Sequence, residues 1–300
     1  MLRLAIPHRF AKRNSSLSMR VMKVIAEDPQ LISRLADRTL REVPIPELST
    51  ADHYVASVID QHRVDRGPEY AAHAAALEVM PLVKEWGANY LRGMTPSGAY
   101  AKGTAISLCT DIDLLIALKP IPGMEMRNVF WNLFEFLTGR NLRPEAHSVA
   151  MRVRHKGVKI DLVPACLMDG NPHEHMLHSD SAAGIRTDVG QHVHLVSSSG
   201  RAQEICALKI WRERNSLDFP SLYLELTVLE ALAGQRFGQL ADNVLTVLRY
   251  VAGRFRKATV RDPANEDNVI SDSLTASEKQ MLAKAASKVL VDEDWKRILW

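Results

Sequence analysis

The pattern of hydrophobic and polar positions predicts a chain that contains both strands and helices. Residues 112–118 form a nearly continuous apolar run, which is typical of a strand buried on both faces. Residues 149–154 and 158–163 predict two further strands, joined by a turn at 155–157. The segment 168–200 is polar, rich in His, Ser, Asp and Gly, and is interpreted as irregular.

Helical periodicity is clearest in the segment from about 69 to 91. Its residues Val79, Val83, Trp86 and Tyr90 recur at a spacing that places them on one face of a helix. Pro81 lies inside this helix and predicts a kink or a break there. Further helices are expected at 15–40, 51–61, 129–137, 201–214, 220–234, 239–256 and 277–290.

These elements fall into three parts along the chain. Residues 1–50 are interpreted as a partly helical N-terminal extension, which is basic at its start. Residues 51–200 hold the strands and form one lobe, with the sheet at 95–165, and residues 201–300 form a helical lobe. The fold class is therefore α+β with a mixed sheet, and the long helix at 69–91 is expected to brace both lobes.

Composition narrows the class of protein. The 300 residues are 46% hydrophobic and 24% charged, a globular balance with enough apolar residues for a substantial core. The formal net charge of +3 suits a phosphate-bearing ligand, but it is too small to indicate a nucleic-acid-binding surface. Three widely spaced cysteines predict no disulfide framework and favour a cytoplasmic setting, and no apolar run reaches the roughly 18 residues of a membrane span.

Two carboxylates and a turn of small residues carry the clearest chemical signal. Asp111 and Asp113 stand two apart at the start of the strand 112–118, so their side chains point to the same side. Paired carboxylates repel each other unless a cation lies between them, and a hard divalent ion prefers oxygen ligands. Just upstream, Gly98 and Gly103 allow the backbone to approach an anion closely and present N–H groups to phosphate.

A third carboxylate, Asp161, lies within an apolar strand 48 residues after Asp113. If the two strands are neighbours, three carboxylates converge, as two-metal phosphoryl or nucleotidyl transfer requires. Asp111 and Asp113 alone are more often a solvated turn. Their combination with the glycine turn and the third carboxylate favours the metal site.

The motifs as a set resemble a known family. Residues 98–106 (GAYAKGTAI) followed by 110–113 (TDID) are similar to the DNA polymerase β-type nucleotidyltransferases, and in particular to their CD-NTase branch. That branch groups bacterial relatives of cyclic GMP-AMP synthase and oligoadenylate synthase. Further resemblance lies in 158–164 (VKIDLVP), 207–211 (ALKIW), 219–225 (FPSLYLE) and 262–269 (DPANEDNV), so that it spans about residues 66–300.

The resemblance implies a two-lobed fold and an activity. The enzyme would join nucleoside triphosphates, ATP among them, into a cyclic di- or trinucleotide or a short oligonucleotide and release pyrophosphate. The product would act as a second messenger in bacterial anti-phage defence, and a regulatory protein partner is expected. Two Mg²⁺ ions, with Mn²⁺ as a substitute, would be held by Asp111, Asp113 and Asp161, the last also a candidate base for the acceptor hydroxyl.

The resemblance also assigns nucleotide-binding roles. Gly98 and Ala99 would offer backbone N–H groups to the triphosphate, Lys209 and Ser221 would hold its distal phosphates, and Tyr223 would stack on the donor base. Ser221 follows a proline at a predicted helix start, a position that favours anions. The family usually has Ser where this chain has Ala99, so one hydroxyl contact is lost.

Several alternatives remain open from the sequence. Lys209 has an apolar helical face and could be a snorkelling surface lysine. The basic hairpin with Arg152, Arg154, Lys156 and Lys159 is usually a solvated face and less often a nucleotide or RNA contact. Histidines at 173, 175 and 178 are weak zinc candidates. The alternative functions are a transferase that extends an RNA end or another acceptor, and an inactive binding module, which the complete set of carboxylates disfavours.

Overall fold

The computed structural model describes residues 49–64, 71–109, 111–155, 157–168, 171–179, 184–292 and 294–299. The chain divides into two units, Met1–Glu47 and Leu48–Trp300, and the described residues all belong to the second. The helix expected at 15–40 and the N-terminal extension therefore lie outside them, apart from the last two residues of the extension. The division into three parts along the chain stays a prediction.

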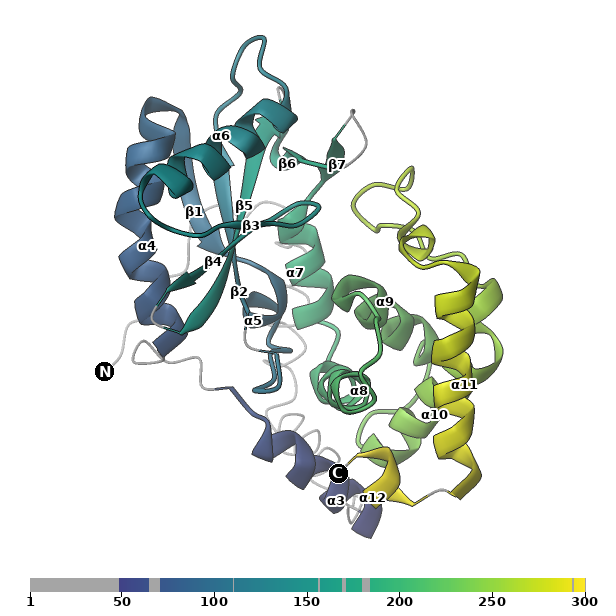
Figure 1. Ribbon diagram of the computed structural model, residues 1–300. Coiled ribbons are helices and arrows are strands. Elements are labelled where there is room, and N and C mark those ends of the chain that lie inside the picture. Colours follow the sequence, from purple (N-terminus) through teal and green to yellow (C-terminus); the bar gives the residue numbers. More distant parts are fainter. Residues whose placement is uncertain are drawn as a thin grey trace, which may run out of the picture. The chain divides into compact units, whose positions relative to one another are not determined.

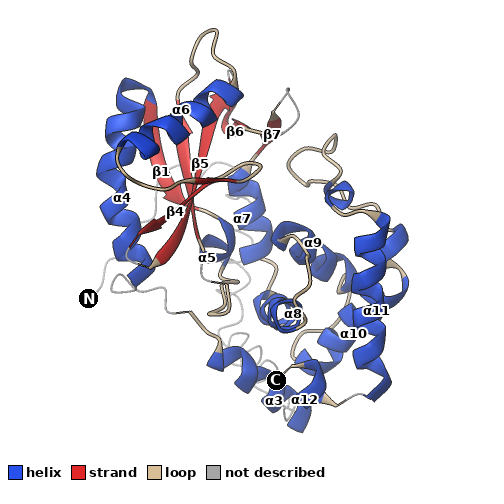
Figure 2. Cartoon of the chain, in the orientation of Figure 1, coloured by secondary structure: helices blue, strands red, loops and turns tan. Residues whose placement is uncertain are grey.

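A mixed sheet forms one part of the described chain (Figures 1 and 2). Its central strands β2 and β5 run parallel, and every other pairing in it is antiparallel. The order is β1-β2-β5-β4-β3, with β6 beside β5 and β7 beside β6. The strands are β1 (Leu91–Pro96), β2 (Ile112–Leu118), β3 (Glu145–Ala146), β4 (Met151–His155), β5 (Val158–Met168), β6 (Asn171–Leu177) and β7 (Ile185–Thr187).

The two faces of β2 and β5 are buried in different ways. Ile112 and Ile116 of β2 and Ile160 of β5 pack on the face covered by α4 (Ala71–Gly87) and α6 (Met126–Gly139). Alternate residues such as Leu115 and Val163 turn to the opposite face and a smaller apolar cluster. Residues of β5 thus alternate between the two faces. The prediction of a doubly buried strand at 112–118 is confirmed, because β2 has apolar cover on both sides.

Helix α4 agrees with the prediction only in part. It continues through Pro81, so the helix does not break there, and the kink stays a prediction. Pro81 is on the exposed side, where water can satisfy the carbonyl that loses its donor. Val79 and Val83 are buried as expected, but Tyr90 lies beyond the helix and is 46% exposed. The buried residues of α4 join the sheet cluster, so the expectation that this helix braces both lobes is corrected.

The second part is helical, and its core includes a helix from the N-terminal side. Val55, Val58 and Ile59 of α3 (Thr50–Gln61) pack with the residues of the later helices, so α3 belongs physically with them and not with the sheet. A capping box at Ser49 and Asp52 begins α3. The later helices are α8 (Ala202–Arg214), α9 (Ser221–Ala231), α10 (Leu240–Gly253), α11 (Ala276–Asp292) and α12 (Trp295–Ile298).

The described part of the segment expected to be irregular contains two strands and a helix. It contains β6, β7 and α7 (Val189–Ser197), which begins at the N-cap Asp188, whose side chain accepts from Gln191 N. The helical spacing of α7 is present at Val189, Val193 and Val196, but the polar residues around them obscure this periodicity. Strands β6 and β7 were missed because they gain stability from pairing at the edge of the sheet, a tertiary effect.

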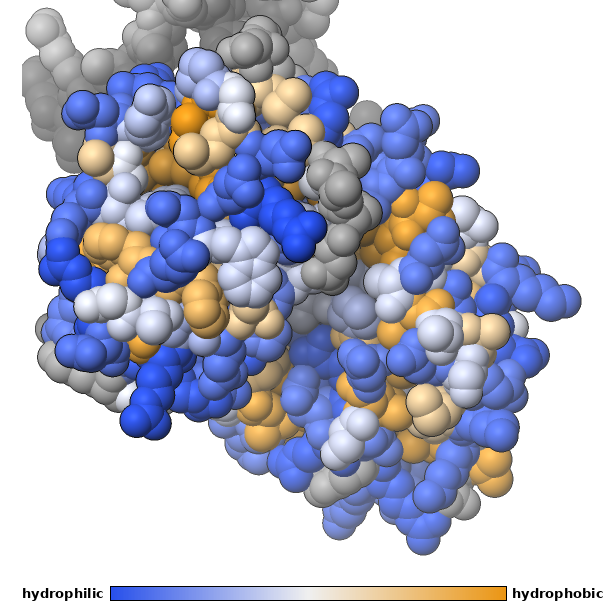
Figure 3. Space-filling view, turned by 45° about the horizontal axis from the view of Figure 1, so that its top comes forward, coloured by the Kyte–Doolittle hydropathy of each residue, from blue (hydrophilic) through white to orange (hydrophobic). Residues whose placement is uncertain are grey.

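The described helices and the face drawn in Figure 3 show how hydrophobic residues are distributed. Among the described residues, no helix is both long and apolar enough to cross a bilayer. On the face shown in Figure 3, hydrophobic residues are interspersed with hydrophilic ones.

Candidate active site

The register of β2 and β5 brings two of the predicted carboxylates together. The strands pair in parallel with Asp113 beside Asp161, on the face opposite to Ile112 and Ile160. Asp111 precedes β2 by one residue, on the same side as Asp113. The sheet therefore gathers at one place three residues that lie up to 50 positions apart in the sequence.

The small-residue turn lies directly against this cluster. Ser97 N donates to Asp113 O at 2.8 Å, and Gly98 begins α5 (Gly98–Lys102) with φ +57°. A Cβ at Gly98 would stand 1.7 Å from Asp113 Oδ2, so no side chain fits there. Gly103 ends the helix with φ +78°, again a conformation that favours glycine. The turn thus places backbone N–H groups beside the carboxylates.

The electrostatics of the cluster show excess negative charge. Burial, and after it the neighbouring Asp161 and Asp111, raise the pKa of Asp113 to about 6, against the opposing influence of Lys102 and Lys209. Asp161 is only 7% exposed. A cation would relieve this repulsion, and three carboxylates are the oxygen donors that Mg²⁺ prefers.

Arg152 partly supplies that positive charge. Its Nε and Nη2 each lie 2.8 Å from an oxygen of Asp161, and Nη2 also lies 2.5 Å from Asp111 Oδ2. Lys159 Nζ is 3.7 Å from Asp111 Oδ1. Within the described ranges, no three metal-ligating side chains are already arranged around a common cation position. The basic hairpin is therefore only in part a solvated face, because two of its charges turn to the aspartates.

Lys209 lies at the centre of a buried polar network. Its Nζ donates to Glu225 Oε1 at 2.7 Å and to Thr104 Oγ1 at 2.9 Å. Lys102 Nζ donates to Glu225 Oε2 at 2.7 Å. Lys209 is 1% exposed and Glu225 0% exposed, so the surface-lysine alternative is wrong. Although burial alone would raise the pKa of Glu225, the two lysines hold it below its usual value.

Ser221 stands where the sequence placed it, exposed at the start of α9 after Pro220. Sequence reasoning missed its partner Arg212, whose Nη1 donates to Ser221 Oγ at 3.0 Å and to Phe219 O at 2.8 Å. Arg212 is 6% exposed and follows Lys209 by three residues on α8. That spacing puts both cations on one side of the helix, a signal that the sequence did contain.

The base-stacking role expected for Tyr223 is corrected. The side chain is 0% exposed and packs against Phe219 and Phe255, with ring centroids 5.3 and 4.9 Å away. Burial raises the pKa of its hydroxyl to about 12. A residue enclosed in this aromatic cluster has no face left for a nucleotide base. Trp211, interpreted as a core residue, is also fully buried.

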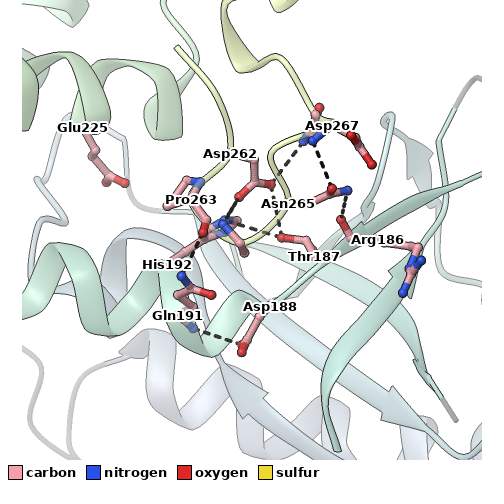
Figure 4. Close-up of polar contacts among 12 residues, drawn as sticks. Arg186, Thr187, Asp188, Gln191, His192, Glu225, Asp262, Pro263, Asn265 and Asp267 are labelled. Atoms are coloured by element: carbon pink, nitrogen blue, oxygen red, sulfur yellow. Dashed lines mark hydrogen bonds and ion pairs between the residues drawn. The ribbon is translucent and has the colours of Figure 1, made fainter. Parts of the chain in front are cut away.

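The loop at 262–268, which the sequence singled out, joins the helical part to the start of α7 (Figure 4). Asp262 is 2% exposed and its Oδ1 lies 2.5 Å from His192 Nε2, while its Oδ2 accepts from Thr187 and Asn268. Asn265 Nδ2 donates to Arg186 O at 2.9 Å. Helix α7 in turn packs against α5, which begins at Gly98. The loop therefore supports the glycine turn indirectly, through α7.

The three clustered histidines do not form one site. His178 stacks on Phe130 at 4.1 Å and its Nδ1 lies 2.6 Å from Ser148 O. His175 is buried, whereas His173 is exposed. These separate environments do not favour the zinc alternative.

Comparisons with known proteins identify relatives of the chain in sequence and in fold. No family model matches the chain. The cyclic AMP-AMP-AMP synthase of Escherichia coli (strain MS 115-1) is 26% identical over 211 residues, which cover 61% of this chain and 64% of that protein. The chain thus matches less than two thirds of the length of this curated relative.

Solved structures show the same fold. CdnC of E. coli MS115-1 with ATP superposes with a TM-score of 0.66 and 18% identity, over 79% of this chain and 89% of that chain. The CD-NTase CdnG of Bradyrhizobium diazoefficiens with GTP gives 0.67 and 13%, over 81% and 91%. CdnC has also been solved as a CdnC:HORMA-deltaN complex, with a TM-score of 0.63 and 18% identity, over 79% and 88%. In sequence and in its two-lobed α+β fold, the chain resembles the CD-NTases, as its motifs indicated.

Proposed function

We propose that the chain is a metal-dependent nucleotidyltransferase that joins nucleoside triphosphates into a cyclic di- or trinucleotide, or a short oligonucleotide, with release of pyrophosphate. The observation that carries this proposal is the pairing of Asp113 with Asp161 directly against Gly98. Carboxylates for metal ions and backbone N–H groups for phosphate thus share one place. The likeness to cyclic oligonucleotide synthases supports the same reaction.

Asp111, Asp113 and Asp161 would hold two Mg²⁺ ions, or Mn²⁺ in their place. When bound, such ions lower the pKa of the attacking hydroxyl and neutralise charge on the leaving pyrophosphate. The residues present fit this role, because the buried carboxylates carry more negative charge than Arg152 balances. Asp161 would orient the acceptor hydroxyl.

The triphosphate would lie between the glycine turn and the helical part. Gly98 and Ala99 would bind it through backbone N–H groups, which do not need the hydroxyl that Ala99 lacks. Lys209 is 1% exposed and uses two of its three ammonium donors on Glu225 and Thr104. Its third donor would reach a distal phosphate only if triphosphate binding uncovers the ammonium. Ser221 would add a hydroxyl, held in place by Arg212.

The substrates and partners follow from the relatives. We expect ATP among the substrates, because the curated relative is named for three AMP units and CdnC was solved with ATP. The CdnC:HORMA-deltaN complex supports a regulatory protein partner. We place the reaction in the cytoplasm, in keeping with three cysteines that form no disulfide among the described residues, and the product in anti-phage signalling.

The alternative is a transferase that adds nucleotides to an RNA end or another acceptor. The structure gives it less support than the sequence did. Arg152 and Lys159, two cations of the basic hairpin, are directed to Asp111, which leaves less of the hairpin to contact an RNA backbone.

The deciding experiment is incubation of the purified chain with the four ribonucleoside triphosphates and Mg²⁺ or Mn²⁺, followed by phosphatase and mass spectrometry. The Asp111→Asn/Asp113→Asn variant is the control. Phosphatase-resistant products from the wild type alone would establish the proposed reaction and give the ring size. Products formed only with an added RNA acceptor would establish the alternative.

If neither protein yields a product, nucleotide binding separates the remaining cases. Metal-dependent ATP binding by the wild type, lost in the double variant, would point to a missing activating partner. Absence of binding to both proteins would refute the proposed triphosphate site.

A further inference from the structure

The guanidinium of Arg152 contacts two of the three carboxylates at the candidate site. Its guanidinium pairs with both oxygens of Asp161 and with one oxygen of Asp111, all at 2.5–2.8 Å. The side chain is 20% exposed, so solvent screens these pairs only in part. One cation thus connects two of the three carboxylates that the proposed function assigns to metal ions.

The position of Arg152 follows from the sheet and not from a flexible side chain alone. Strands β4 and β5 are antiparallel, and Arg152 is the direct partner of Asp161 in their register. Directly opposed residues on neighbouring strands share a face and lie within contact distance. The backbone therefore places Arg152 opposite Asp161 whenever the hairpin is formed, with the carboxylate within reach of its guanidinium.

Arg154 offers a matched comparison on the same strand. It follows Arg152 by two residues, but its side chain is 58% exposed and its Nε lies 3.8 Å from Glu145 on β3. The two arginines share a strand, a charge and a side of the sheet. They differ in which carboxylates they contact.

A divalent ion at this site would share carboxylates with Arg152. Both oxygens of Asp161 and Oδ2 of Asp111 accept hydrogen bonds from the guanidinium. Each of these oxygens thus has fewer lone pairs left for a metal ion. A full positive charge so close to the carboxylates also repels an approaching cation.

We propose that Arg152 is the resident counter-cation of the three-carboxylate site: it holds Asp161 and Asp111 in place without metal and competes with divalent ions for their oxygens. The inference rests on the proposed function, since it takes these aspartates to be the metal ligands. Arg152 is on this view a positioning residue that sets the metal concentration at which the enzyme becomes loaded.

The test is Mn²⁺ binding to the full chain without nucleotide, measured by the electron paramagnetic resonance signal of free Mn²⁺. Arg152→Gln removes the charge, Arg152→Lys keeps it, and Arg154→Gln removes the matched charge. We expect Arg152→Gln to lower the Mn²⁺ dissociation constant by roughly tenfold or more, because a competing charge is lost. Arg152→Lys should stay close to the wild type, and Arg154→Gln should differ by less than about twofold.

A second measurement guards against a fold defect in the variants. Without metal, Arg152→Gln should unfold at a lower temperature than the wild type, since its carboxylates repel each other unopposed. Added Mn²⁺ should raise its Tm more than that of the wild type, because tighter binding stabilises the folded state more.

Unchanged or weaker Mn²⁺ binding by Arg152→Gln would contradict the proposal that Arg152 competes with divalent ions for the carboxylates. An equal gain in Mn²⁺ affinity from Arg154→Gln would also contradict it, because the gain would then be a general effect of removing positive charge. Asp113→Asn distinguishes this failure from failure of the proposed function. If the wild type and Arg152→Gln both bind Mn²⁺ no better than Asp113→Asn, the aspartates are not the metal site and both proposals fall.

Discussion

At the scale of single residues, the site depends on a contact that only glycine permits. Gly98 has a positive φ, and the Asp113 carboxylate occupies the space where its Cβ would stand. The glycine therefore serves two purposes, a left-handed turn and room for the Asp113 carboxylate. Gly123 also has a positive φ, +71°, but no atom lies within 4 Å of its would-be Cβ.

This difference gives the first prediction. Gly98→Ala should displace Asp113 and lower nucleotidyl transfer by at least about a hundredfold, since misplacing a reacting group by about 1 Å has an effect of this size. Gly123→Ala should keep its activity and lose only about 1 kcal/mol of folding free energy. Initial rates and urea unfolding of both variants would check this, and equal activity of the two would contradict it.

Tyr223 gives a second prediction at this scale. Its buried hydroxyl has no hydrogen-bond partner among the described residues, and its ring is enclosed by Phe219 and Phe255. Tyr223→Phe should leave ATP affinity unchanged and the unfolding free energy within about 0.5 kcal/mol, because an unsatisfied buried hydroxyl adds no stability. Weaker ATP binding with normal stability would show that the residue does contact nucleotide.

At the scale of elements, the loop 262–268 connects the helical part to the β7–α7 junction. Its contacts combine a buried ion pair, side-chain amides and backbone carbonyls (Figure 4). Burial by itself would raise the pKa of Asp262, but hydrogen bonding and the charge of His192 hold it below its ordinary value. Asp262 is therefore ionised in the folded protein at neutral pH.

Replacement of Asp262 should show how much its ionised carboxylate contributes to the stability of the folded protein. Asp262→Asn should reduce the unfolding free energy at pH 7 by roughly 1–3 kcal/mol, as one oxygen acceptor becomes a donor. A depressed folded pKa stabilises the protein above the unfolded value of about 3.9 and loses its effect below it. The gap between wild type and variant, measured by urea unfolding, should therefore shrink as the pH falls below about 4. Asp267→Asn, an exposed change in the same loop, is the control, and a pH-independent gap would contradict the argument.

At the scale of the whole described molecule, the two parts meet through a fully buried ionic network. Lys102 and Thr104 come from the sheet part, whereas Lys209 and Glu225 come from α8 and α9. One carboxylate balances two ammonium groups, which leaves positive charge beside Asp113 and the glycine turn. The same residues thus connect the two parts and would favour the proposed triphosphate beside the glycine turn.

Removing the shared carboxylate should affect both properties. Glu225→Gln should lower the unfolding free energy by about 3–5 kcal/mol, because two buried ammonium groups lose their counter-charge. Glu145→Gln, which removes an exposed partner at 3.8 Å, should change it by less than about 1 kcal/mol. Thermal unfolding of the two variants would test this, and an equal effect would show that the network does not join the parts.

The sequence by itself determined the central strands, most of the helices and the positions of the three aspartates. These features depend on local spacing: an apolar run at 112–118, alternation at 158–163 and two carboxylates two residues apart. The tertiary structure decided what lies between them. Arg152 reaches Asp161 through strand register, β6 and β7 form only by pairing at the sheet edge, and Tyr223 is buried by rings up to 32 positions away. Long-range pairing and packing have no local spacing in the sequence, which is why these features became visible only in the folded chain.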